Sequence, residues 1–136
     1  MMKELTLDAT IENIDVVTDF VNAELEALDC PMKAQTQIDV AIDELFSNIA
    51  HYAYGSEIGT ATVCIEFERD PLCAVLTFLD RGKPYDPLQK QDPDVTLAVE
   101  DRPIGGLGIF IVKKTMDDIS YERRDGQNIL TIRKKI

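Results

Sequence analysis

The sequence lacks the features that mark membrane and secreted proteins. Its 136 residues contain no apolar run close to the roughly 20 residues that a membrane-spanning helix needs. The opening segment MMKELTLDAT has neither the basic region nor the apolar region of a signal peptide. We therefore expect a cytoplasmic protein that does not act on membranes.

Cysteine and histidine are also scarce. The chain has one histidine and three cysteines, and these show neither a Cys-x-x-Cys pair nor the Cys/His spacing of a zinc site. We expect Cys30, Cys64 and Cys73 to be small apolar residues in a reducing compartment. A zinc site is not expected.

Basic residues are few relative to acidic ones. There are 14 Lys and Arg against 25 Asp and Glu, which gives a formal net charge of −11. Such a surface repels phosphate backbones and anionic lipids, so nucleic acid and membranes are not expected as partners. The charge serves either solubility alone or the binding of a basic partner surface, and composition leaves both open.

Apolar residues, in contrast, are abundant. They make up 45% of a chain whose length fits one domain, and there is no repeat, linker or low-complexity segment. We therefore expect residues 1–136 to form a single domain.

The spacing of the apolar residues predicts the order of the elements. Alternation indicates strands, and recurrence at helical spacing indicates helices. We expect a strand near 4–9, helices near 11–28 and 33–54, a hairpin at 60–80, a long loop with a short helical turn at 81–104, a helix opened by glycines within 104–118, and a hairpin of 118–124 and 128–135. Hairpins without βαβ alternation indicate an α+β two-layer sandwich, with helices on one face of a mixed, mainly antiparallel sheet. This order does not fit a Rossmann or P-loop fold.

The segment IDELFSNIAHYAY, residues 42–54, carries two polar residues on an apolar helix. Glu44 and Asn48 are four positions apart, so their side chains lie on one face, one turn apart. An amide oxygen suits Mg²⁺, and a nearby carboxylate can accept a proton from a water or hydroxyl. The two residues are equally compatible with a solvated polar stripe.

Two further clusters contain glycine. Gly105-Gly106-x-Gly108 precedes an apolar helix, where backbone N–H groups and the helix dipole can bind phosphate, although such glycines also form simple turns. In DRGKPYDP, Asp80 ends an apolar strand, and Gly82 would let a flat ring approach. Asp80 needs a donor such as an exocyclic amine, or else it caps its own turn. Together the three clusters offer the parts of a Mg-nucleotide site.

These motifs carry a resemblance to a known family. ELFSN resembles the N box of the GHKL ATPase superfamily, DRGKPYDP its first glycine box and GGLGIFIVKKTMD its second. YAY, DP and GGLGIFIV resemble the bacterial anti-sigma-factor serine/threonine kinase branch. The resemblance implies a Bergerat, histidine-kinase-like ATPase fold with an N box at about 40–54, glycine boxes at 80–87 and 105–116, and a lid at about 87–104.

The resemblance also implies roles at the phosphate end of a nucleotide. Asn48 would be a ligand of Mg²⁺, and Glu44 would be the base toward the attacking hydroxyl. Arg102, in the lid, would point to the γ-phosphate. The glycines of the second box would cradle the phosphates (Gly105, Gly106 and Gly108).

At the base end, the resemblance implies that Asp80 accepts the adenine amino group while Gly82 lies beneath the ring. Thr131 would support this contact through water. Tyr85 in the first glycine box and Leu107 in the second complete the set of residues expected to bind ATP or ADP.

The branch implies a function in regulation. Its members bind a sigma factor or an anti-sigma antagonist, and many phosphorylate a serine on the antagonist, a STAS-domain protein. The resemblance therefore implies an ATP-dependent serine/threonine kinase that works by switching between these partners. The resemblance also implies a homodimer. The alternative is a nucleotide-binding module that sequesters a regulatory partner without significant kinase activity.

Overall fold

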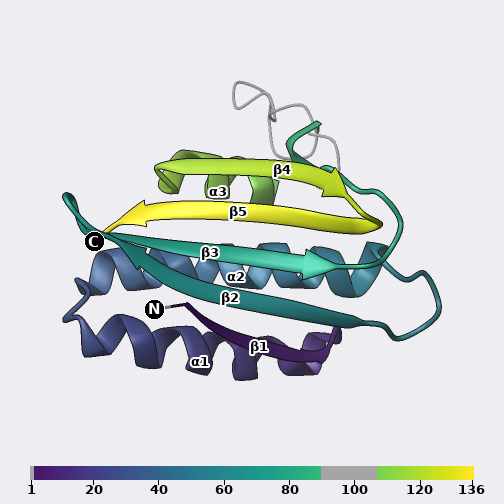
Figure 1. Cartoon of the computed structure of the whole chain (residues 1–136), viewed down its shortest axis with the longest axis horizontal. Coiled ribbons are helices and arrows are strands. Elements are labelled where there is room, and N and C mark those ends of the chain that lie inside the picture. Colours follow the sequence, from purple (N-terminus) through teal and green to yellow (C-terminus); the bar gives the residue numbers. More distant parts are fainter. Residues whose placement is uncertain (1, 90–106) are drawn as a thin grey trace.

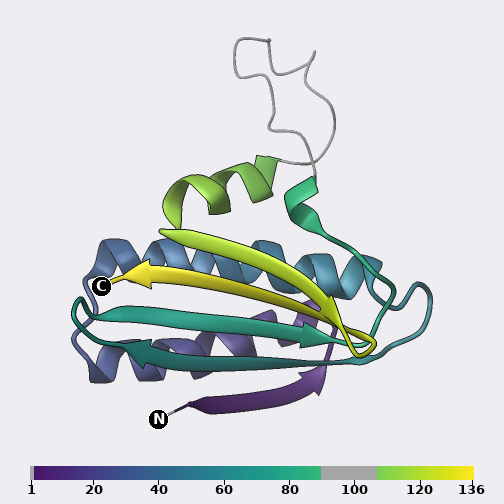
Figure 2. The ribbon, with the colours of Figure 1, turned by 45° about the horizontal axis from the view of Figure 1, so that its top comes forward.

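The computed structural model describes residues 2–89 and 107–136, which form two layers (Figure 1). One layer is a five-stranded sheet, and the other contains the helices, which lie on one face of that sheet (Figure 2). The strands are β1 (Lys3–Asp8), β2 (Thr60–Glu68), β3 (Cys73–Asp80), β4 (Asp118–Arg124) and β5 (Gln127–Lys135), and the α-helices are α1 (Ile14–Ala27), α2 (Met32–Tyr52) and α3 (Leu107–Thr115). The predicted α+β sandwich is confirmed.

The sheet has the strand order β1-β2-β3-β5-β4, and each pairing is antiparallel. Tight turns join β2 to β3 and β4 to β5. The second turn contains Asp125 and Gly126, both with positive φ angles of 55° and 77°, as a two-residue hairpin requires. This turn fixes the register of β4 with β5, in which Arg123 lies opposite Asn128. In the neighbouring pair, Asp80 of β3 lies opposite Asn128 of β5.

The core lies between the helices and one face of the sheet. Alternate residues of the central strands point into it, for example Val63, Phe78 and Ile132, none of which is more than 1% exposed. The largest buried side chain, Phe46 of α2, is fully enclosed. Burying each such side chain contributes about 1.5–3 kcal/mol. The sequence pattern therefore determines which face the helices cover.

Some boundaries differ from the sequence-based expectation. The first helix begins as a 3₁₀ turn at Ile11–Asn13 before α1, and α2 ends at Tyr52 rather than at residue 54. Gly55, with a φ of 64°, lies in the turn that follows α2. The long loop begins with a short 3₁₀ helix, Pro87–Gln89. Most of the predicted lid, including Arg102, lies outside the described residues, as do Gly105 and Gly106 of the second glycine box.

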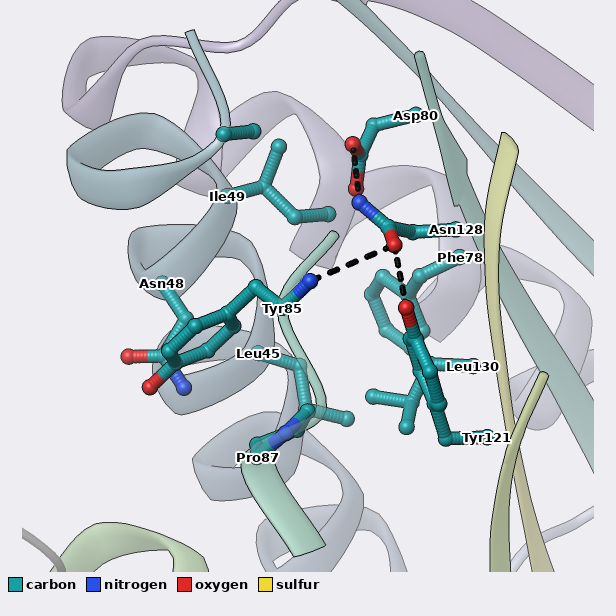
Figure 3. Close-up of a pocket in the computed structure, with 11 residues that line it drawn as sticks. Leu45, Asn48, Ile49, Phe78, Asp80, Tyr85, Pro87, Tyr121, Asn128 and Leu130 are labelled. Atoms are coloured by element: carbon teal, nitrogen blue, oxygen red, sulfur yellow. Dashed lines mark hydrogen bonds between the residues drawn. The ribbon is translucent and has the colours of Figure 1, made fainter. Parts of the chain in front are cut away.

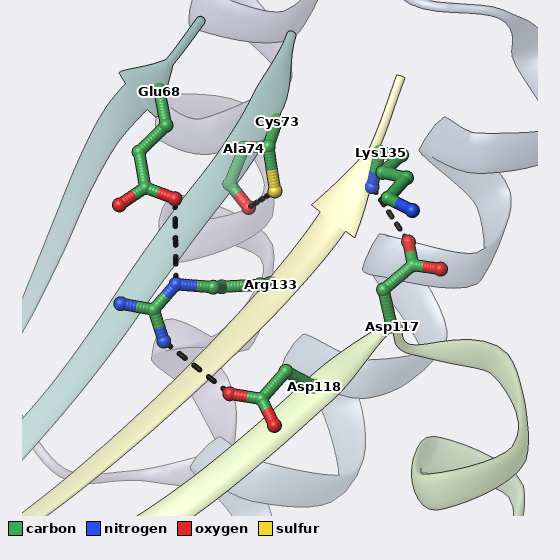
Figure 4. Close-up of polar contacts among 7 residues, drawn as sticks. All are labelled: Glu68, Cys73, Ala74, Asp117, Asp118, Arg133 and Lys135. Carbon is green, nitrogen blue, oxygen red and sulfur yellow. Dashed lines mark hydrogen bonds and ion pairs between the residues drawn. The ribbon is translucent and has the colours of Figure 1, made fainter. Parts of the chain in front are cut away.

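Two residues of the last strand, Arg133 and Lys135, contact acidic neighbours (Figure 4). Arg133 forms ion pairs of 3.4 Å with Glu68 and with Asp118, and the Lys135 backbone N–H donates to the Asp117 carboxylate at 2.7 Å. Because these groups are largely exposed, each ion pair contributes at most about 1 kcal/mol. The contacts tie β2, β4 and β5 together at the end of the sheet remote from Asp80.

In the ranges 2–89 and 107–136, no helix is both long and apolar enough to cross a bilayer. The three cysteines are free thiols; Cys64 and Cys73 are buried and Cys30 is partly buried. Desolvation by burial raises the pKa of each thiol above its ordinary value. At neutral pH the thiols are therefore protonated and unreactive.

Candidate functional site

A pocket opens between the second half of α2 and the adjoining ends of β3, β4 and β5 (Figure 3). Its walls are mostly apolar, as in Leu45 and Phe78. Three polar side chains in the described part of the chain are buried, and all three line this pocket: Asn48, Asp80 and Asn128. Apolar walls with a few buried polar groups are typical of a small-molecule site.

Asp80 lies at the inner end of the pocket, where β3 ends, and its side chain is only 6% exposed. The Gly82 backbone N–H and the Asn128 amide both donate to its Oδ1, each at 2.9 Å. These two donors offset the cost of burying the carboxylate. Among the described residues, the hydrogen bonds to this carboxylate go to Oδ1, which leaves Oδ2 as an acceptor for a donor on a ligand.

Asn128 is a site residue that the sequence analysis missed. Its side chain, 5% exposed, lies in phase with the core residues Leu130 and Ile132 of β5. The sequence contained a signal for this residue, because Asn128 is a polar residue at a strand position that faces the core. The amide also donates to the Lys83 carbonyl oxygen at 2.8 Å, so it links β5 to both Asp80 and the turn that follows β3.

The expected role of Thr131 is corrected by the strand alternation. Because successive side chains of a strand point to opposite faces, Thr131 lies on the face opposite to Asn128 and Leu130. It is not among the residues that line the pocket. On β5, Asn128 is the residue that supports Asp80.

The turn after β3 packs tightly against the end of α2. The Lys83 backbone N–H donates to the Ala53 carbonyl oxygen at 2.8 Å, and a Cβ atom at Gly82 would lie 2.2 Å from that oxygen. Only glycine is therefore compatible with this contact. The Tyr54 hydroxyl accepts from the Arg81 backbone N–H at 2.9 Å and donates to the Thr60 carbonyl.

Glu44 and Asn48 lie together on α2, as their spacing predicts. The Asn48 amide nitrogen donates to Glu44 Oε1 at 3.3 Å, and Asn48 is 8% exposed whereas Glu44 is partly exposed. Because the amide nitrogen is directed to Glu44, the amide oxygen is the group that a cation would meet. Asn48 lines the pocket, and Glu44 lies one turn earlier on the helix.

Gly108, in the first turn of α3, lies against Glu44. A Cβ atom at this position would be 2.2 Å from Glu44 Oε2 and 2.7 Å from Oε1. The glycine thus leaves room for a carboxylate beside the N-terminus of α3, where the helix dipole favours negative charge.

We predict that Gly108→Ala displaces the Glu44 carboxylate. Glycine to alanine in an open helix position stabilises a protein by about 1 kcal/mol, whereas here the clash offsets that gain. We expect an unchanged or lower Tm. If Glu44 is the proton acceptor that the sequence resemblance implies, ATP turnover should decrease about tenfold or more, since proton transfer would depend on the position of this group. A higher Tm with unchanged turnover would contradict the contact.

The remaining predicted residues are placed as follows. Tyr85 lines the pocket, and its ring stacks on Tyr52 with centroids 5.2 Å apart. Leu107 is the first residue of α3, is 46% exposed and does not line the pocket. In residues 2–89 and 107–136, no three His, Cys, Asp or Glu side chains form a metal-binding group. A cation here would rely on the Asn48 oxygen, on water and on its ligand's own oxygens, as Mg²⁺ commonly does.

Comparison with known proteins identifies the family. Residues 7–134 match the model of the histidine kinase-like ATPase domain, so the chain belongs to this family. The match extends over nearly the whole chain and confirms the resemblance drawn from the N box and glycine boxes. Membership of an ATPase family implies ATP or ADP as a ligand.

Two similar proteins carry the names of serine or serine/threonine kinases. The chain is 30% identical over 95 residues to the serine/threonine-protein kinase BtrW of Bordetella bronchiseptica, an alignment covering 70% of this chain and 66% of that protein. It is also 30% identical over 95 residues to the serine-protein kinase RsbW of Bacillus cereus, covering 67% of this chain and 58% of that protein. The alignments therefore span less than two thirds of these relatives.

Proposed function

We propose that the chain is an ATP-dependent protein serine/threonine kinase of the anti-sigma-factor type. The observation that carries this proposal is the pocket with Asp80 and Asn128 at one end and the Glu44–Asn48 pair beside the other. This arrangement supplies an acceptor for the base, a site for a cation and a proton acceptor. Phosphoryl transfer requires mainly such positioning and charge neutralisation.

At the base end, the pocket would hold adenine. Asp80 Oδ2 would accept a hydrogen bond from the exocyclic amine, and Gly82 would let the ring approach the turn after β3. Tyr85 would line the same cavity. The apolar walls exclude water, which strengthens the polar contact.

At the phosphate end, Asn48 and Glu44 would have separate tasks. The Asn48 oxygen would bind Mg²⁺, and this ion would neutralise charge on the phosphate oxygens. Glu44 would accept the proton of the attacking serine or threonine hydroxyl. Arg102 would face the γ-phosphate, and the glycines of the second box, 105, 106 and 108, would surround the phosphates with backbone N–H groups. Leu107, in the same box, would contact the nucleotide.

We propose two partners. A STAS-domain anti-sigma antagonist would be the phosphoacceptor, and a sigma factor would be the protein that the chain binds and releases as it switches between the two. The relatives named as a serine/threonine-protein kinase and a serine-protein kinase support a serine or threonine hydroxyl as the phosphoacceptor group. We further propose that the protein acts as a cytoplasmic homodimer. A binding module without kinase activity remains the second candidate, but it would not require the proton acceptor that Glu44 supplies.

Calorimetric titration with ATP and ADP, with and without Mg²⁺, tests nucleotide binding. We expect both nucleotides to bind, and we expect Mg²⁺ to increase the affinity for ATP. Asn48→Ala should weaken ATP binding in the presence of Mg²⁺ about tenfold or more. Gln35→Ala, at the other end of α2, is the matched control and should bind as the wild type does. If neither nucleotide binds, the chain is a partner-binding scaffold and the kinase proposal is wrong.

A further inference from the structure

We infer that Asn128 and Tyr121 form a positioning relay that determines base selectivity by fixing the orientation of Asp80. This inference rests on the proposed nucleotide-binding function. It adds Tyr121, which neither the sequence motifs nor the proposed roles include, and it defines the task of Asn128 beside Asp80. Tyr121 lies on the edge strand β4, and Asn128 lies on β5 between it and Asp80 (Figure 3).

The Asn128 amide uses its complete hydrogen-bonding capacity within the protein. A carboxamide has two N–H donors and an oxygen with two acceptor positions. The nitrogen donates to Asp80 Oδ1 at 2.9 Å and to the Lys83 carbonyl at 2.8 Å. The oxygen accepts from the Tyr85 backbone N–H at 3.4 Å and from the Tyr121 hydroxyl. Asn128 is therefore left with no group for the base, and it acts by positioning Asp80.

Tyr121 completes the hydrogen bonding of this amide on its oxygen side. Since an amide oxygen only accepts, the Tyr121 hydroxyl must be the donor in their contact. The reversed amide would place its oxygen against the Asp80 carboxylate and the Lys83 carbonyl, where acceptors would face one another. The acceptors on Asp80 and Lys83 therefore set the orientation of the amide. The backbone contact from Tyr85 is long, at 3.4 Å, so the Tyr121 hydroxyl is the main donor that holds the amide oxygen in place.

The relay has a consequence for the ligand. With Oδ1 bound by Gly82 and Asn128, the Asp80 Oδ2 stays an acceptor directed to a ligand. A purine with an exocyclic amine, such as adenine, can donate to it. Guanine presents a carbonyl oxygen at the same ring position, and two acceptors would repel. Removal of the Tyr121 hydroxyl should therefore reduce both the affinity for ATP and the preference for ATP over GTP.

The test compares ATP and GTP binding by calorimetry for wild type, Tyr121→Phe, Asn128→Asp and Thr131→Val. Wild type should prefer ATP by about tenfold or more, the value of one buried hydrogen bond. Tyr121→Phe should weaken ATP binding about fivefold or more and reduce the ATP preference, because the Asn128 oxygen then loses its main donor and the amide holds Asp80 less firmly. Thr131→Val, on the other face of the same strand, should match wild type.

Asn128→Asp gives a readout that a merely structural role would not change. It places a second carboxylate against Asp80, and such a pair retains one proton at raised pKa. ATP binding should be weak at about pH 8 and should recover relative to wild type at about pH 6, when the shared proton restores a donor to Asp80. Loss of binding without recovery at the lower pH would contradict the relay.

A second measurement does not need nucleotide. By NMR, the Asn128 side-chain amide protons should exchange with water slowly in wild type and about tenfold faster in Tyr121→Phe, since their hydrogen bonds then open more often. If wild type binds ATP but Tyr121→Phe shows wild-type affinity, selectivity and exchange, the relay is wrong and the proposed function stands. If wild type binds neither ATP nor GTP, both proposals are overturned.

Discussion

Replacing Glu44 with glutamine is expected to lower ATP turnover by about 10²–10⁴-fold, the range that a general base contributes. Glutamine retains the size of the side chain and an oxygen that can accept from the Asn48 amide, as Glu44 does at 3.3 Å. It cannot accept a proton from a hydroxyl or a water. The variant should therefore bind ATP within about threefold of the wild-type affinity, because the ground-state contacts are preserved.

The measurement is release of inorganic phosphate from Mg-ATP, with water as the acceptor, alongside calorimetric ATP binding. Asp43→Asn is the matched control, since it makes the same chemical change at the adjacent, exposed position of α2. Asp43→Asn should leave both values unchanged. Turnover by Glu44→Gln near the wild-type rate would show that another group, or none, serves as the base.

Asp80→Asn is expected to weaken ATP and ADP equally, by about 10- to 100-fold, the worth of a hydrogen bond to a charged group. The Gly82 N–H and the Asn128 amide both require an acceptor at the position of Oδ1. The new amide must therefore turn its oxygen to them and its NH₂ group toward the pocket. This NH₂ group would then face the exocyclic amine of the base. Both groups are donors, so no hydrogen bond can form between them.

Equal loss for the two nucleotides is the distinguishing result, because ATP and ADP share the base and differ only in phosphate. Asp125→Asn, in the exposed β4–β5 turn, is a suitable control, since Asn tolerates the positive φ of 55° at that position. Weaker ATP binding with ADP unaffected would assign Asp80 to the phosphate end of the site. That outcome would require a different orientation of the ligand.

The elements were predictable because their signals are local. Helical spacing identified α2, and two runs rich in Val, Ile, Phe, Leu and Thr identified β2 and β3. Asp80 and Gly82 stood out as polar and flexible residues after an apolar strand. The 3₁₀ turn before α1 was not predicted, since a helical pattern does not distinguish i,i+3 from i,i+4 hydrogen bonding at a terminus.

The site residues that were missed depend on tertiary structure. Asn128 reaches Asp80 only through the register of β3 with β5, and these two residues are 48 positions apart in sequence. Thr131 was selected by residue type and position in a motif, without regard to which face of β5 it occupies. The alternation that buries Leu130 and Ile132 would have excluded it. Strand phase is therefore a stronger guide to a site residue than residue type alone.

The tyrosines give this protein a built-in optical reporter. The chain has four tyrosines and no tryptophan. Tyr85 and Tyr121 line the pocket, Tyr52 stacks on Tyr85, and Tyr54 holds the turn that contains Gly82. Tyrosine fluorescence and near-ultraviolet circular dichroism thus originate largely from one end of the molecule. A change in either signal during a titration will report on that end without any label, while the remote end of the sheet contributes almost nothing.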